Sequence, residues 1–204
     1  MGMSDVKSVT ITADTQALDA DGISVAAAVG NNAALTIGGA LASGGACAFD
    51  AGRIVTILSA GNDSSKSFTV VGTDVNGSAQ TESITGANAG TATGAEFFKT
   101  IASITAVGNP AGDVSAGVNA SAADVIFAGR SRLKGAFLTS TATAGNVDFL
   151  NTSPTGSSLM KISSVSDADA TRDVVIPENG VLFTAGIYIE YTVSTFLTMT
   201  AFHA

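Results

Sequence analysis

The sequence predicts an all-β chain folded as two small antiparallel β-sandwich domains, the second of them jelly-roll-like. Short runs of alternating apolar and polar residues recur along the 204 residues. Turn signals rich in Gly, Asn, Asp and Pro separate these runs, and no amphipathic helical stretch of useful length interrupts them. A polar stretch of small residues at 119–124 suggests a boundary between domains 1–120 and 121–204.

In the first domain, the most clearly specified part is a β-meander over residues 53–86, in which two polar turns join three strands. Its second turn contains Asn76-Gly77, a dipeptide typical of tight hairpins. The Gly-, Ala- and Thr-rich segment 87–95 is expected to be a loop. The expected strands cover residues 8–12, 23–29, 34–37, 53–58, 67–71, 80–85, 96–107 and 113–118.

In the second domain, about eight further strands are expected at a similar spacing. Residues 177–180, Pro-Glu-Asn-Gly, place Pro and Gly where a tight turn requires them. The expected strands cover residues 125–127, a basic strand around 130–134, and then 134–140, 147–150, 159–163, 173–176, 181–183, 186–192 and 196–201.

Composition points to a surface that other subunits cover. Charged residues make up only 13% of the chain, and much of its 46% hydrophobic content is alanine. A free monomer usually keeps more dispersed charge on its surface, so we expect an assembly; the alternative is a secreted protein with a well-hydrated Ser/Thr/Gly surface. The net charge of −8 argues against nucleic-acid binding, which needs clustered Lys and Arg.

No catalytic, cofactor or metal site is expected. The single cysteine, Cys47, excludes an intrachain disulfide, and the only histidine, His203, lies near the end of the chain. Asp19 and Asp21 begin like a calcium loop, but position twelve from Asp19 is Gly30 instead of the required Glu.

No membrane association is expected either. The first residues lack the apolar run of a signal peptide. The longest apolar run, 23–29, is too short to span a bilayer. The chain is therefore expected to be made and folded in a cytoplasm.

A series of turn signatures follows in order along both domains. It runs from Arg53-Ile-Val-Thr-Ile57 through Phe68-Thr-Val-Val-Gly-Thr-Asp74 and Asn76-Gly77 to Arg132-Leu-Lys-Gly135 and Pro177-Glu-Asn-Gly180. This order resembles virion proteins of tailed bacteriophages over about three quarters of the chain, a length that suits one or two small domains.

The resemblance implies a structural virion protein with no cofactor and no enzymatic activity. The expected role is a capsid decoration or cement protein on the capsid surface, assembled in the host cytoplasm, which binds the major capsid protein and copies of itself as a homotrimer. The alternative is a head-fibre or tail-associated module that binds a receptor or glycan. Such sites usually show exposed aromatic side chains, for which only Tyr188, Tyr191 and a few Phe are available.

An enzyme such as a polysaccharide hydrolase is the third hypothesis, because paired carboxylates can cleave glycosides. Its candidate pairs, Asp167/Asp169 and Glu178/Glu190, lie in or beside expected turns, where carboxylates are ordinarily solvated. The polar turns and the basic strand are instead expected to contact other subunits. The candidate contact residues are Asn62, Asp63, Asp74, Asn76, Arg130, Arg132 and Lys134.

Overall fold

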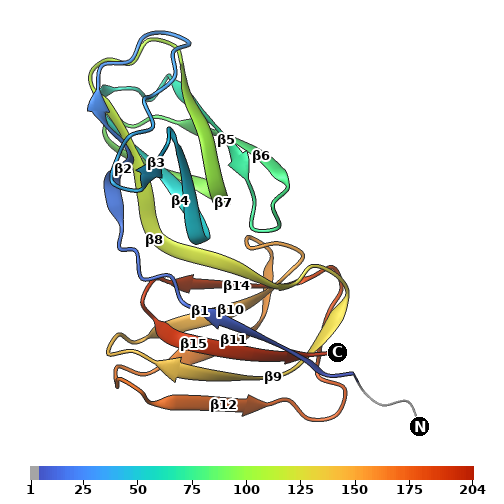
Figure 1. The fold of residues 1–204 in the computed structure, drawn as a ribbon. Helices are drawn as coiled ribbons and strands as arrows, with labels where there is room; N and C mark the ends of the chain where they lie inside the picture. The colour runs from blue at the N-terminus through green and yellow to red at the C-terminus, as the bar shows by residue number, and fades with distance from the viewer. Residues whose placement is uncertain (1–4) are drawn as a thin grey trace. The chain divides into compact units, whose positions relative to one another are not determined.

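The computed structural model describes residues 5–204 and contains only β-strands, turns and connecting segments over that range. Its strand pairs are antiparallel, which confirms the predicted all-β, sandwich-like class (Figure 1). The chain divides into two compact units. We call residues 17–120 the inserted unit, and residues 5–16 together with 121–204 the terminal unit.

This division differs from the predicted domains at the start of the chain. Residues 5–16 belong with 121–204, whereas the sequence predicted them to be in the domain 1–120. The reason is a strand pairing: β1 (Lys7–Thr12) lies antiparallel to β15 (Phe196–His203), with Val9 opposite Ala201. A pairing between the two ends of a chain cannot be read from local sequence patterns.

The terminal unit contains two sheets. One has the order β1-β15-β9-β12, with β13 also pairing with β9; the other has the order β11-β10-β14-β8. Along the chain, β1, β9, β12, β13 and β15 alternate between sheets with β8, β14 and the hairpin β10–β11, which is compatible with a jelly roll. The remaining bounds are β8 (Val114–Phe127), β9 (Ser131–Ser140), β10 (Gly145–Asn151), β11 (Ser157–Ser164), β12 (Thr171–Val175), β13 (Val181–Phe183) and β14 (Ile187–Thr192).

The core of the terminal unit follows from the alternation of its strands. Alternate residues point inward and are buried, as Val147 and Phe149 are on β10. The rings of Tyr191 and Phe196 meet edge to face with centroids 4.8 Å apart. Other fully buried side chains are Leu133, Leu138, Phe183, Ile187, Ile189 and Met199.

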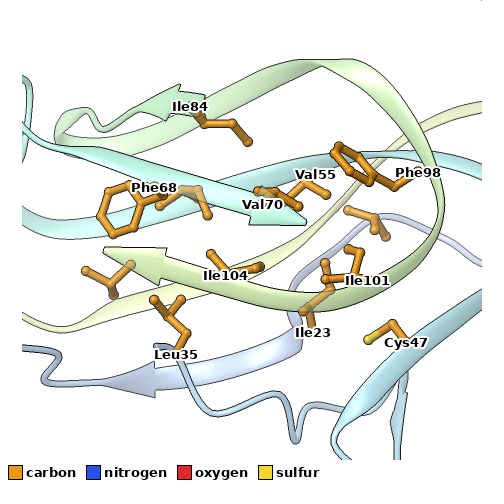
Figure 2. Close-up of a cluster of buried hydrophobic side chains, with 14 of the residues drawn as sticks. Ile23, Leu35, Cys47, Val55, Phe68, Val70, Ile84, Phe98, Ile101 and Ile104 are labelled. Carbon is orange, nitrogen blue, oxygen red and sulfur yellow. The ribbon is translucent and has the colours of Figure 1, made fainter. Parts of the chain in front are cut away.

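The inserted unit contains the strand order β8-β4-β7-β5-β6, with β2 pairing with β8 and β3 with β4. Its strands are β2 (Asp19–Ala27), β3 (Ala42–Ser43), β4 (Ala46–Asn62), β5 (Ser67–Thr73), β6 (Ala79–Thr85), β7 (Asn88–Val107) and the beginning of β8. Figure 2 shows its core, into which Ile23, Val55, Phe68, Val70, Phe98, Ile101 and Ile104 project.

The meander predicted over residues 53–86 is wrong in its strand order. The hairpin β5–β6 forms as expected, and Gly77 adopts the positive φ of 81° that its turn requires. However, β7 lies between β4 and β5 and pairs with both. The apolar residues of β7, Phe98, Ile101 and Ile104, fill the core at that place, so the polar turn after β4 connects strands that are not neighbours.

Three other local predictions also differ from the structure. The expected loop 87–95 is largely the start of β7, and the expected spacer 119–124 lies within β8. The segment expected as a strand at 34–37 forms only an isolated bridge from Ala34 to Thr105. Small residues such as Ala and Gly have weak strand preferences, and here the pairing partner decides their conformation.

Candidate contact surfaces

The described residues contain no group of three or more His, Cys, Asp and Glu side chains placed to hold a metal ion. No helix that could cross a membrane occurs among residues 5–204. Cys47 lies in the inserted unit with only 2% of its surface exposed, and burial raises the pKa of its thiol to about 11. A thiol with that pKa is protonated at neutral pH and is a poor nucleophile.

His203 occupies β15 of the terminal unit, where its partners are Ser131 and Phe127. The Ser131 hydroxyl lies 3.1 Å from the His203 Nδ1, and the Phe127 ring centroid lies 5.0 Å from the imidazole centroid. Burial lowers the pKa of His203 below its ordinary value, and the charge of Lys7 lowers it further. This histidine is therefore part of the packed interior of its unit.

Both polar turns of the inserted unit carry an exposed asparagine. The side-chain oxygen of exposed Asn62 accepts a hydrogen bond from the Ser64 amide at 3.2 Å, which forms an Asx turn. In the other turn, Asp74 Oδ1 accepts hydrogen bonds from the amides of Asn76 and Ser78, both at 2.8 Å. Because Asn76 is exposed and Asp74 half-buried, this hairpin turn can still reach a partner.

Asp63 is not the surface residue that the sequence analysis expected, because 0% of it is exposed. Its amide donates to the Ala87 carbonyl, and its Oδ1 accepts a hydrogen bond from the Ala111 amide, each at 2.8 Å. Asp63 therefore ties three segments of the inserted unit together. A buried aspartate that bridges chain segments and an exposed aspartate in a turn have the same local sequence pattern, so the pattern does not distinguish them.

The basic strand is only partly as predicted. Arg130 precedes the first residue of β9 and is exposed, whereas Arg132 and Lys134 lie within β9 and are half-buried. Lys134 Nζ donates to the Glu178 carbonyl at 3.1 Å, and Arg132 donates to the Gly180 carbonyl at 3.3 Å. Both side chains thus hold the 177–180 turn through hydrogen bonds to backbone carbonyl groups.

A larger surface covers the outer side of the sheet β1-β15-β9-β12. The pairing registers place its outward residues in three cross-strand rows, and we call these residues the threonine face. The rows are Thr12–Thr198–Thr139–Thr171, Thr10–Thr200–Phe137–Asp173 and Ser8–Phe202–Gly135–Val175. Asp173 is its one charged member.

Apolar side chains on the threonine face are well exposed. The exposed fraction is 79% for Val175, 38% for Phe137 and 37% for Phe202. The hydroxyls of Thr10 and Thr200 lie 2.9 Å apart and hydrogen-bond to each other. The face therefore combines exposed aromatic and aliphatic groups with a row of hydroxyls, of which the Thr10 and Thr200 pair bond each other.

The outer side of the other sheet has a different character. We call its outward residues Asn146, Asp148, Lys161, Ser163 and Glu190 the charged face. Asp148 lies directly opposite Glu190 and forms an ion pair with Lys161 at 3.1 Å. Burial, and then the charge of Asp148, raise the pKa of Glu190, while Lys161 lowers it. A shallow hollow of about 230 Å³ beside Asp148 and Glu190 includes Tyr191 and Thr192.

The carboxylates considered for glycoside cleavage each have other local neighbours in the structure. Glu190 has Asp148 as its cross-strand neighbour, and Glu178 lies in the turn that Lys134 holds. Asp167 and Asp169 flank a tight turn in which the Ala170 amide donates to the Asp167 carbonyl at 3.2 Å. The geometry gives neither predicted pair a shared partner among the described residues.

The sequence carries a local signal for the threonine face in two of its strands. Threonine alternates with apolar residues in 8–12, Ser-Val-Thr-Ile-Thr, and again in 196–202, Phe-Leu-Thr-Met-Thr-Ala-Phe. Each run predicts a strand with one apolar side and one hydroxyl side. Only the pairing of β1 with β15 brings the two hydroxyl sides together.

Comparison of the chain with models of known protein families, with curated proteins and with solved structures gave no match.

Proposed function

We propose that this chain is a non-catalytic structural protein of a tailed-bacteriophage particle, where it decorates and reinforces the major-capsid lattice. The observation that carries the proposal is the threonine face, a broad and almost uncharged sheet surface on a chain of net charge −8. Such a face can lose its water in a protein contact with only one charge, that of Asp173, left to be paired.

The order of turn signatures that resembles virion proteins of tailed phages also supports this role. The turns themselves are well fixed, as the Asp74 and Asp63 hydrogen bonds show. A decoration protein gains stability from several modest contacts repeated over a lattice, so it needs rigid units with preformed surfaces. Both units of this chain supply such surfaces.

The second candidate is a head-fibre or tail-associated module that binds a receptor or glycan. The exposed rings of Phe137 and Phe202 on one flat sheet favour it, because sugar rings stack on aromatic side chains. The tyrosines considered for this role do not: Tyr188 and Tyr191 are both buried. The threonine face also lacks Asn, Gln, Tyr and Trp side chains, which usually orient a sugar.

Heating of phage heads tests the reinforcing role. Particles made without this chain are expected to release their DNA at a lower temperature than wild-type particles, and addition of the purified chain is expected to restore the wild-type release temperature. The measurement is dye-detected DNA release during a temperature ramp. Equal release temperatures with and without the chain would contradict reinforcement.

The position of the chain in the particle separates the two candidates. A reconstruction of the intact particle is expected to show it on the capsid lattice in many copies. Density confined to a fibre tip or to the tail would reject the decoration role and favour the glycan-binding candidate.

A further inference from the structure

We infer that the threonine face is the surface through which copies of this chain bind one another. This inference names the surface for the self-association that the proposed virion role includes. It rests on the proposed function only for its biological setting. The test is made in solution without phage particles.

Charge identifies a second copy as the occupant. Two copies that each carry a net charge of −8 repel, so they can meet closely only where like charges are nearly absent. The threonine face has one carboxylate, Asp173, whereas the charged face has Asp148 opposite Glu190. Arg132 and Lys134 continue β9 beyond Gly135 at the border of the threonine face. Identical copies therefore bring both signs of charge to the contact.

The side chains of the face lose little when they are covered. Threonine is branched at Cβ and has few rotamers, so its immobilisation costs little entropy. The Thr10 and Thr200 hydroxyls bond each other, so one donor of this pair already has a partner within the protein. Phe137, Phe202 and Val175 contribute the apolar area whose burial drives association.

The dimensions of the face set the expected strength. With strands about 4.8 Å apart and alternate residues about 6.8 Å apart, the rows cover roughly 20 Å by 20 Å. Covering this area on two copies buries on the order of 800 Å² in total, which is less than the roughly 1,200 Å² of a stable specific interface and in the range of weak, transient contacts. The association should therefore be weak for the free chain and become effective at the high local concentration of a lattice.

Sedimentation velocity of the purified chain tests the inference. The wild-type mass is expected to rise above the 20.1 kDa of one chain as the concentration reaches about 100 μM, a range that suits an interface of this size. Higher salt should strengthen the association, because it screens the repulsion between the acidic copies. A mass that stays at one chain throughout would overturn the inference.

Matched variants identify the face. Phe137→Asp is expected to weaken association by about tenfold or more, since it places a like charge at the centre of the contact. Ser163→Asp adds the same charge to the charged face and is expected to associate like the wild type. Thr10→Asp, on the edge strand β1, repeats the test if Phe137→Asp does not fold, as judged by its melting curve. Equal loss in Ser163→Asp would overturn the assignment.

Cross-linking gives a second readout. Thr198→Cys places a thiol on the threonine face, while the native Cys47 is buried and should react slowly. A short bismaleimide is expected to link two copies of Thr198→Cys, but not two copies of Ser163→Cys. Failure of Thr198→Cys to cross-link, or a monomeric chain that binds polysaccharide through Phe137, would overturn the inference. Neither result would change the outcome of the heating experiment.

Discussion

The two sheets of the terminal unit share one apolar interior, but their outer sides differ. On the threonine face, four threonines form a complete cross-strand row, and one charge occurs in the three rows. On the charged face, Asp148 lies opposite Glu190 with Lys161 beside them. The side chains on the two inner sides must pack against each other in one core. The side chains on the outer sides have no such constraint, so the difference between the outer sides is informative about function.

The cross-strand neighbours show how each face is stabilised. Like charges directly opposite each other destabilise a strand pair, and at Asp148 and Glu190 the nearby Lys161 offsets part of that cost. The threonine face avoids the cost, because Thr10 and Thr200 meet through a hydrogen bond between neutral hydroxyls. Because the threonine face has no such pair of like charges, an acidic neighbour can contact it without adding to an existing repulsion.

The largest expected effect concerns the shared interior. Phe149→Ala on the β10 side should lower the free energy of unfolding by about 3–5 kcal/mol, and Met199→Ala on the β15 side by about 2–5 kcal/mol. Both side chains are fully buried, so each deletion leaves a cavity. Urea denaturation followed by fluorescence measures both losses.

The exposed control is Leu197→Ala, which should cost much less because Leu197 is partly exposed on β15. If Met199→Ala cost as little as Leu197→Ala, the two sheets would not share one tightly packed core. The difference between the sheets would then extend to their inner sides.

The next effect separates the faces by pH. Burial and Asp148 raise the pKa of Glu190 above its ordinary value of 4.5, so the folded chain holds this proton more tightly than the unfolded chain. Stability therefore falls as pH rises through the raised pKa. Glu190→Gln should melt at a higher temperature than the wild type at pH 7, by roughly 2 °C, since the group is half-exposed and well screened.

As the pH falls through 4.5, Glu190 becomes protonated in both states, so the advantage of Glu190→Gln should shrink toward zero. Thr200→Val on the threonine face is the matched control and should show no such pH dependence. Melting curves from pH 4 to pH 8 follow both variants. An advantage of Glu190→Gln that is constant across this range would show that charge is not its cause.

The sequence predicted the elements of this fold better than their partners. Alternation located the hairpin β5–β6 and most strands of the terminal unit, because those patterns are local. It did not predict β7 between β4 and β5, or the pairing of β1 with β15, because both depend on residues distant in the chain. The same limit hid the threonine face, whose rows exist only after four separate strands pair.

The candidate contact residues show a second limit. Asp63 and Asp74 both occur in polar turns, yet Asp63 is buried by the 111 segment and Asp74 is half-exposed in a two-strand hairpin. Turn chemistry determines backbone conformation, and it does not determine what packs over the turn. The basic strand predicted around 130–134 likewise includes Arg130, although β9 begins one residue later.

A smaller effect tests whether the hydroxyls of the threonine face support each other. A double-mutant cycle of Thr10→Val and Thr200→Val should give a coupling of about 0.2–1 kcal/mol, typical of cross-strand pairs. Chemical denaturation at low protein concentration avoids any contribution from association. Additive losses in the two single variants would show that the 2.9 Å contact contributes nothing to stability.

The smallest effect concerns the ion pair on the charged face. Lys161→Met should cost less than about 1 kcal/mol, because the lysine side chain is 53% exposed and surface ion pairs contribute little. Its clearer consequence is electrostatic: Lys161 lowers the pKa of Glu190, so its removal should raise that pKa. A titration of the Glu190 carboxyl carbon by NMR measures the shift, with Lys161→Arg as the charge-retaining control. An unchanged Glu190 pKa in Lys161→Met would mean that the like-charged pair is stabilised by solvent alone, and that the charged face tolerates its repulsion without a balancing cation.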